Sequence, residues 1–136
     1  VYDHPFLWGS KRTGPDLHRV GGKYPHSWHY NHMIDPSSMS PGSIMPAYPW
    51  LLTNKLDTST TPAKIRVLQF LGTPYEKGYD EKANKDLKKQ AKQIADELKS
   101  VDKNILDDEL SEREIVALIA YLQRLGTDIN PEKSKE

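Results

Sequence analysis

The chain has 136 residues, enough for one domain with a modest core, and its 19 basic and 19 acidic side chains leave no net charge to attract nucleic acid. Its longest apolar run, residues 115–122, is far shorter than the roughly 20 residues that cross a bilayer. The complete lack of cysteine excludes disulfides, thiolate metal sites and thiol catalysis.

The two halves of the chain differ sharply in composition. Residues 1–54 hold every His, Trp and Met and most of the Pro and Gly, whereas residues 55–136 hold most of the charge. Because Pro and Gly interrupt regular structure, the first half is predicted to be loop-rich and the second half helical. We expect one domain over residues 1–130 and a disordered polar tail at 131–136.

In the first half, a turn at residues 14–17 leads into a short helical stretch. A helix is predicted over residues 27–34, with Ser27 as its N-cap and with Trp28 and His32 on one face. Asp35 and the proline after it end this helix. Residues 37–49 are predicted to form an irregular loop that carries two methionines.

Three helices are predicted in the second half, and no strand longer than a few residues is expected anywhere in the chain. The first starts at Thr61 as N-cap and runs for about eleven residues to Gly72. The second, over residues 80–101, is amphipathic and lysine-rich, with an apolar face that includes Val101. The third starts at Ser111, which forms a capping box with the glutamate three residues later, and ends at Gly126.

Histidine and methionine are the candidate ligands. His26, His29 and His32 are spaced three apart, which spreads their rings over about 120° around a helix, so all three do not converge on one ion. Met45 precedes a proline in the irregular loop, so its thioether, a soft ligand suited to haem iron, is free to project inward. Taken alone, each of these residues is also explained as a core or surface residue. The Trp-, Tyr- and Met-rich loops fit either a wrapped flat apolar ligand or a loop-rich core, and composition by itself favours the core.

The order of these features resembles most of a class I cytochrome c domain: a Gly-Pro-x-Leu turn, a short helix, a Met-Pro loop and a terminal Ala-Tyr-Leu helix. More specifically, the chain resembles the mono-haem c-type cytochrome subunit (subunit II, the FixO or CcoO family) of cbb3-type cytochrome c oxidase. The segments that carry this resemblance are Tyr2 to Phe6, Trp8 to Leu17, Val20 to Gly22, Trp28, His32, Met45 to Leu51 and Ala117 to Gly126.

The resemblance implies an all-α, class I cytochrome c-like fold and a haem c held by a Cys-x-x-Cys-His motif, whose His is the proximal ligand. Met45 matches the distal ligand, and Pro15 matches the residue whose carbonyl accepts the proximal imidazole N–H. Leu17 is then expected to pack on the haem face. Tyr48 and Trp50 are expected to form pocket walls. Arg19 or Lys23 is expected to bind a haem propionate.

The resemblance also implies a function, partners and a location. The subunit passes electrons from periplasmic donors, or from its partner di- or tri-haem cytochrome subunit, to oxidase subunit I. It is a non-catalytic electron-transfer subunit on the periplasmic side of the bacterial inner membrane, where a membrane anchor precedes the cytochrome domain.

This chain departs from the family pattern because it has no cysteine and starts at Val1 without an initiator Met. We therefore expect that the haem-attachment helix preceded Val1, and that these residues alone bind no covalent haem and transfer no electrons. The stripe formed by Leu118, Leu122 and Leu125 then needs another cover, either from the helix over 80–101 or from a second copy of the chain.

Two other hypotheses stay open. One is a haem-less cytochrome-like interaction module that docks to a membrane partner. The other is a histidine metal-binding enzyme, for which the sequence offers no carboxylate or fourth ligand close to the three histidines. A Cys-x-x-Cys-His motif encoded shortly upstream of Val1 would favour electron transfer over both.

Overall fold

The computed structural model describes residues 17–127, in which helices joined by loops are the regular structure. In chain order its elements are η1 (Leu17–Arg19), α1 (His26–Ile34), α2 (Pro36–Met39), α3 (Trp50–Thr53), α4 (Thr61–Phe70), α5 (Tyr79–Val101), η2 (Leu110–Glu112) and α6 (Glu114–Arg124). The only β pairing within these residues is an isolated antiparallel bridge between Lys55 and Arg113. The all-α prediction is therefore confirmed, whereas the predicted tail at 131–136 lies outside the described residues.

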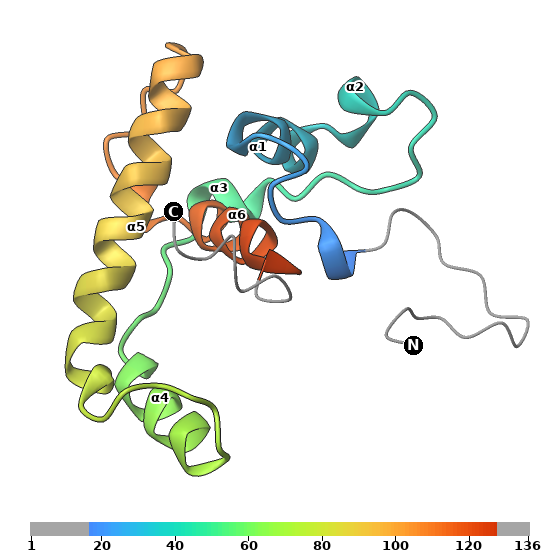
Figure 1. Cartoon of the computed structure of the whole chain (residues 1–136). Coiled ribbons are helices and arrows are strands. Elements are labelled where there is room, and N and C mark those ends of the chain that lie inside the picture. The colour runs from blue at the N-terminus through green and yellow to red at the C-terminus, as the bar shows by residue number, and fades with distance from the viewer. Residues whose placement is uncertain (1–16, 128–136) are drawn as a thin grey trace, which may run out of the picture.

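The core forms where α5 crosses α6 (Figure 1). From α5 it takes residues spaced three and four apart, and from α6 it takes the face formed by Ile115, Val116 and Ile119, all 0% exposed. Leu110 of η2 closes one side of the cluster. Because each large side chain contributes about 1.5–3 kcal/mol when fully buried, this contact holds the two best-patterned helices together.

The long amphipathic helix is confirmed, since α5 spans nearly the predicted range. Val101, predicted on its buried face, is instead 70% exposed. It occupies the last turn, beside an open pocket and directly before the chain leaves the helix at Asp102.

The three predicted N-caps are wrong by a few residues. The helix α1 starts one residue earlier, after Pro25, so Ser27 lies inside its first turn. The N-cap of α4 is Thr60 rather than Thr61. Ser111 belongs to the separate helix η2, and α6 starts only at Glu114, whose backbone N–H donates to the carbonyl of Asn54 at 3.1 Å. A tertiary contact thus satisfies the donor that the capping box was predicted to satisfy.

The predicted irregular loop contains a short helix. Asp35 caps α2 by accepting hydrogen bonds from the backbone N–H groups of Ser37 and Ser38, at 3.0 and 3.3 Å, and Pro36 fits the first helical position. As a result Met39 lies on a helix, while Met45 lies in the extended chain that follows.

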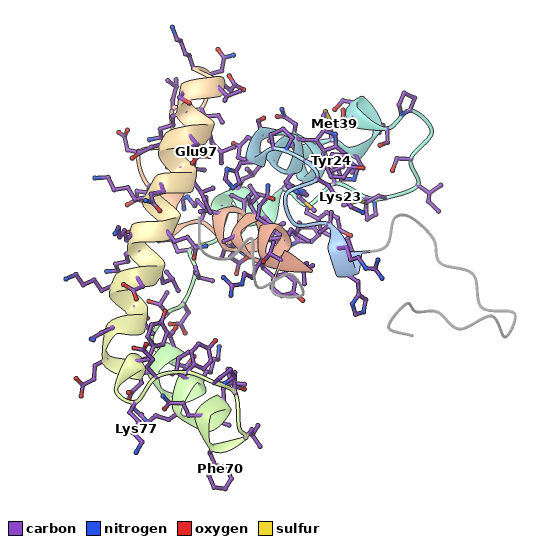
Figure 2. All side chains as sticks on the ribbon, viewed as in Figure 1. Lys23, Tyr24, Met39, Phe70, Lys77 and Glu97 are labelled. Atoms are coloured by element: carbon purple, nitrogen blue, oxygen red, sulfur yellow. The ribbon has the colours of Figure 1, made fainter. Side chains whose placement is uncertain are left out.

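The helix α4 lies at one end of α5, away from the other helices (Figure 1). An ion pair between Arg66 and Asp80, at 2.8 Å, joins it to the first turn of α5. Its last residue, Phe70, is 90% exposed and projects away from the chain (Figure 2). The other end of α5, which carries the core, is the one that lies near α1 and α6.

Candidate functional site

A pocket of about 860 Å³ lies between η1, α1, the loop of residues 40–48 and α6. Its lining is mostly apolar and aromatic, and among the described residues that form it none is acidic, lysine or arginine. Leu118 and Leu122 form the α6 side of the wall, while Leu17 and Val20 form the η1 side. A pocket of this size and character is typical of a site for a large, mainly apolar small molecule.

Met45 lines this pocket from the loop side and is half-buried. The loop is attached to α1 by a backbone hydrogen bond in which the N–H of Tyr48 donates to the carbonyl of Met33 at 2.9 Å. The backbone N–H of Met45 donates to the hydroxyl of Ser43 at 3.2 Å. These bonds hold an otherwise irregular segment beside α1, with a thioether in the pocket wall.

The η1 side of the pocket is set by two glycines. The N–H of Gly21 donates to the carbonyl of Leu125 at 2.9 Å, and a Cβ on Gly21 would lie 2.5 Å from the carbonyl oxygen of Gln123. Gly126 has φ +80°, and a Cβ there would lie 2.6 Å from the carbonyl oxygen of His18. Only glycine allows the backbone after η1 to approach the end of α6 so closely.

One wall of the pocket is a continuous aromatic stack. Tyr24 stacks on Trp28 with ring centroids 4.1 Å apart, and Trp28 stacks on His32 at 4.5 Å with an interplanar angle of 15°. His29 meets the edge of this stack, 5.4 Å from Trp28 at 86°. The predicted shared face of Trp28 and His32 is confirmed, and it fixes the orientation of the imidazole of His32.

His29 and His32 both bring polar atoms into this apolar wall. His29 is 2% exposed. Its Nε2 and the Nδ1 of His32 are buried without a hydrogen-bond partner in the described part of the chain. Burial lowers the pKa of both rings, and the neighbouring His26 and His32 lower the pKa of His29 further. Both imidazoles are therefore neutral at pH 7, each with one donor and one acceptor nitrogen.

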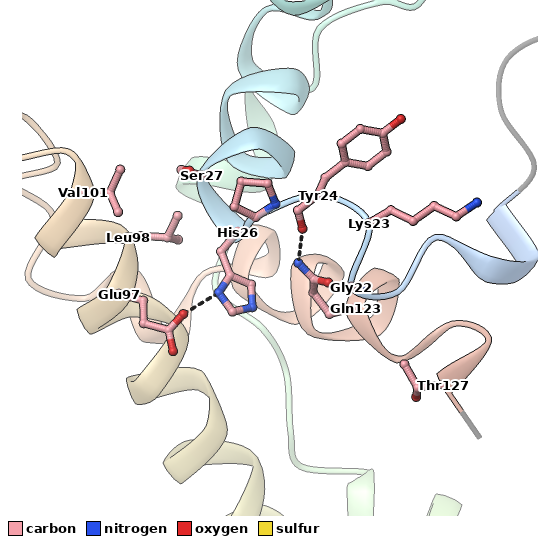
Figure 3. Close-up of a pocket in the computed structure, with 11 residues that line it drawn as sticks. Gly22, Lys23, Tyr24, His26, Ser27, Glu97, Leu98, Val101, Gln123 and Thr127 are labelled. Carbon is pink, nitrogen blue, oxygen red and sulfur yellow. Dashed lines mark hydrogen bonds and ion pairs between the residues drawn. The ribbon is translucent and has the colours of Figure 1, made fainter. Parts of the chain in front are cut away.

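A second, smaller pocket of about 600 Å³ lies between α1, α5 and α6 (Figure 3). Here Nδ1 of His26 lies 2.7 Å from the carboxylate of Glu97, and the side-chain amide of Gln123 donates to the carbonyl of Tyr24 at 2.7 Å. The same Gln123 accepts from the backbone N–H of Gly22 at 2.9 Å. These contacts fasten the start of α1 to α5 and α6.

The three histidines therefore face two different places, as their helical spacing predicted. His26 faces Glu97, whereas His29 and His32 line the pocket that contains Met45. No group of three or more His, Cys, Asp or Glu side chains capable of holding a metal ion is found within residues 17–127.

The structure brings together some of the residues that the sequence singled out. Met45, Leu17 and Tyr48 line the larger pocket. Trp50 does not: it is 49% exposed and meets the ring of Tyr48 edge-on at 5.2 Å. Arg19 is exposed and lies outside the lining, and Lys23 lines the smaller pocket. Pro15 lies outside the described residues.

Sequence reasoning missed Tyr24, His29 and Met33 as parts of this wall. The available signal was spacing: His29 and Met33 are four residues apart on one side of α1, and Tyr24, which precedes the helix, lies four residues before Trp28. That signal does not distinguish a pocket wall from a packed core, because both require large side chains on the buried side.

The family comparison bears directly on this pocket. A family model described as cytochrome c oxidase, mono-haem subunit/FixO, matches residues 1–129. The chain belongs to this family. FixO proteins are the mono-haem, electron-transferring subunit of the membrane-bound cbb3-type oxidase, so the identification agrees with the sequence resemblance. Comparison with curated proteins gave no match.

Between residues 17 and 127, no helix combines the length and the apolar character that a bilayer crossing requires.

The larger pocket fits the haem that the FixO family implies. Its volume and apolar lining suit a large flat ligand, and the thioether of Met45 is a soft donor suited to haem iron. The unpartnered imidazole nitrogen atoms on α1 match a ligand that also carries polar groups, because buried polar atoms in native proteins nearly always find a partner. These 136 residues supply no thiol for covalent haem attachment, since none of them is a cysteine.

Proposed function

We propose that this chain forms the Met-ligand side of the haem pocket of a periplasmic electron-transfer domain, the haem c domain of a cbb3-type oxidase. The observation that carries the proposal is Met45 in the wall of a large apolar pocket enclosed by η1, α1 and α6. When bound, the haem supplies a one-electron redox centre. The chain supplies the thioether ligand and excludes water with apolar side chains.

Several of the residues singled out from the sequence have a role in this proposal. Met45 is the distal ligand, and a methionine opposite a histidine favours the reduced iron. Leu17 packs on a haem face, and Tyr48 forms part of the wall. Trp50 supports Tyr48 through their edge-on ring contact. Pro15 accepts the proximal imidazole N–H through its carbonyl, and Arg19 acts at the rim as a propionate partner.

The proximal histidine and the two attachment cysteines belong, in this proposal, to a segment that precedes residue 1 in the complete gene product. The 136 residues alone then carry no covalent haem and transfer no electrons. The partners of the complete protein are oxidase subunit I and the di- or tri-haem cytochrome subunit, on the periplasmic side of the bacterial inner membrane.

The first experiment compares the complete gene product with the 136-residue chain, each purified after expression with the cytochrome c maturation machinery. The complete protein is expected to show stoichiometric covalent haem by pyridine haemochrome spectra, and the chain alone none. Covalent haem on the short chain would contradict the proposal that the haem-attachment residues lie outside these 136 residues. A complete protein without haem that still binds the oxidase would support the interaction-module alternative instead.

A second experiment tests the ligand. Met45→Ala in the complete protein is expected to abolish the methionine-to-iron charge-transfer band and to lower the reduction potential, because the thioether stabilises reduced iron. Met39→Ala is the matched control, since Met39 lies on α2 outside the pocket lining. An unchanged charge-transfer band in Met45→Ala would exclude Met45 as the ligand.

A further inference from the structure

A bond between Met45 and the haem iron does not account for the buried polar atom of His29. Its side chain is almost fully buried at 2% exposed, and Nε2 has no partner within the described residues. Nδ1 of His32, on the same helix, is likewise buried and without a partner there, although the His32 side chain as a whole is half-buried. Buried polar atoms in native proteins nearly always have a hydrogen-bond partner, so two unpartnered ones in one wall indicate that a bound ligand supplies their partners.

The positions of the two imidazole rings indicate which kind of ligand group could be their hydrogen-bond partner. His29 and His32 are three residues apart on α1, which makes their side chains neighbours on one side of the helix. Both line the Met45 pocket, and none of the described residues that line it is acidic, lysine or arginine. No lining cation is therefore described that could pair with an acidic group in this pocket, so its side-chain hydrogen-bond donors include the imidazoles and the tyrosine and serine hydroxyls.

A carboxylate is the ligand group that best matches two neutral imidazole donors. It only accepts hydrogen bonds, and it has two oxygens with room for several donors. Bonds from N–H groups to an ionised carboxylate are about twice as strong as those between neutral groups. A haem carries two such groups, its propionates, at one edge of an otherwise apolar ring.

We propose that His29 and His32 form a carboxylate subsite in the Met45 pocket, in which Nε2–H of His29 and Nδ1–H of His32 donate to one propionate of the bound haem. This inference rests on the proposed function and extends it by assigning the anchor for the polar edge of the cofactor. It replaces exposed Arg19 with two neutral imidazoles, each with a buried ring nitrogen, as the main propionate partners.

The aromatic stack holds these donors in place. The ring of His32 lies flat on Trp28 at 4.5 Å, and the ring of His29 stands nearly perpendicular to both Trp28 and Tyr24, at 86° and 88°. Ring orientation is thus set by packing before the ligand binds, so little freedom is lost when the hydrogen bonds form.

The subsite also affects the iron. A propionate whose charge is shared with two N–H donors offers less negative potential to the oxidised, more positive iron. Removing the donors therefore favours the oxidised state and lowers the reduction potential. His29 and His32 are positioning residues in this scheme, because they act on the iron through the propionate.

The test uses the complete haem-loaded protein, with resonance Raman of the propionate bending mode and a redox titration as readouts. His29→Phe removes the ring nitrogens while keeping a planar side chain, and is expected to move the bending mode to lower frequency and to lower the reduction potential. His29→Gln and His32→Asn each keep an N–H donor near the original nitrogen. Both variants are expected to retain a bending frequency and a reduction potential close to those of the unchanged protein. His26→Phe is the matched control, on the same helix but facing Glu97 outside this pocket.

Two outcomes would overturn the subsite. One is an unchanged bending mode and potential in His29→Phe with haem still bound. The other is loss of an axial-ligand band in His29→Phe, which would make His29 an iron ligand instead. If His29→Phe does not fold, ¹⁵N-histidine NMR of the unchanged protein decides: a rapidly exchanging or deprotonated Nε2 of His29 excludes the bond. A complete protein without haem would instead refute the proposed function on which the subsite rests.

Discussion

Gly21 and Gly126 meet where the chain after η1 crosses the end of α6, and this contact sets one side of the pocket. Both positions leave no space for a Cβ, and Gly126 also has a left-handed backbone at φ +80°. The pocket wall formed by Leu17 and Val20 therefore depends on two residues that do not line the pocket themselves.

Gly126→Ala is expected to destabilise the chain by more than Gly72→Ala. Both residues have positive φ, so each substitution costs about 1–2 kcal/mol in backbone strain. Only at position 126 does the new Cβ also meet backbone, 2.6 Å from the carbonyl oxygen of His18, whereas nothing lies within 4 Å at Gly72. Urea denaturation of both variants measures the difference, and equal midpoints would contradict the role of this crossing.

His29 and His32 make the stability of the haem-free chain pH-dependent. Burial lowers the pKa of both rings, so the unfolded chain, with a histidine pKa of about 6.5, takes up protons before the folded chain does. The stability is fully present above that value and falls as the pH drops below it. Urea midpoints are expected to decline from about pH 7.5 to about pH 5.5, and less steeply in His29→Gln. A flat profile in the unchanged chain would contradict the burial of these rings.

Acid has a second effect at lower pH through Asp107. The guanidinium of Arg113, 2.8 Å away, is the main cause that holds the pKa of this carboxyl below its usual range. The stability from this pair is present above the ordinary aspartate pKa of about 3.9 and is lost as the pH falls below it. The acid unfolding of the chain thus has two separate pH windows with different chemical origins.

Arg113 determines where α6 begins. Its guanidinium donates to the carbonyl of Thr53 at 2.7 Å and to Asp107, and its backbone is extended at φ −80°, ψ 149°. These contacts join the last residue of α3 to the start of α6, and they explain why the helix starts after Arg113 and not at Ser111.

Arg113→Gln is therefore expected to lower the urea midpoint clearly, because it removes contacts to two separate segments. Arg66→Gln is the matched control: Arg66 forms one ion pair, its side chain is 60% exposed, and such surface pairs contribute at most about 1 kcal/mol. A loss no larger in Arg113→Gln than in Arg66→Gln would show that this contact does not determine the start of α6.

The α5–α6 contact is the main source of stability among the elements. Ile119→Ala removes a side chain that is 0% exposed and is expected to cost about 2–5 kcal/mol. Leu106→Ala, at a position that is 83% exposed, is expected to change the free energy of unfolding by less than about 0.5 kcal/mol. Thermal or urea unfolding measures both, and a small loss for Ile119→Ala would place the core elsewhere.

Within residues 17–127, apolar side chains that α5 does not cover gather in two regions. The α6 stripe predicted to need a cover contributes Leu118 and Leu122 to the pocket, while the core cluster uses the neighbouring face of α6. At the far end of α5, Val67 and Phe70 of α4 are 57% and 90% exposed, and Leu71, which follows the helix, is 70% exposed. The sequence predicts that the haem-free chain self-associates through its last helix. The exposed apolar side chains at the end of α4 are a second surface through which two copies could associate.

Sedimentation velocity over a range of concentrations separates these two surfaces. We expect the haem-free chain to associate through the open pocket beside α6, and a Phe70→Ser, Leu71→Ser double variant to associate equally well. Association lost in the double variant would assign the contact to α4, and a monomer at every concentration would exclude both surfaces.

Local patterns in the amino-acid order were sufficient to predict the helices α5 and α6, the all-α class and the methionine before a proline in a loop. Hydrophobic periodicity and turn-forming residues act between neighbours along the chain, so they can be recognised from the sequence alone. The family resemblance came from motifs of the same local kind. Helix starts were predicted less well: at α6 a bond from Glu114 to the distant Asn54 replaced the expected cap, and α1 starts directly after Pro25 without a side-chain cap.

Long-range packing decided which of the first-half residues share a pocket. Three histidines with identical spacing have two different environments, because α5 presents Glu97 to His26 while the loop returning through Tyr48 closes over His29 and His32. The same packing leaves Trp50 beside the pocket and Met45 within it. Burial of a side chain depends on segments far away along the chain, and no spacing within one helix contains that information.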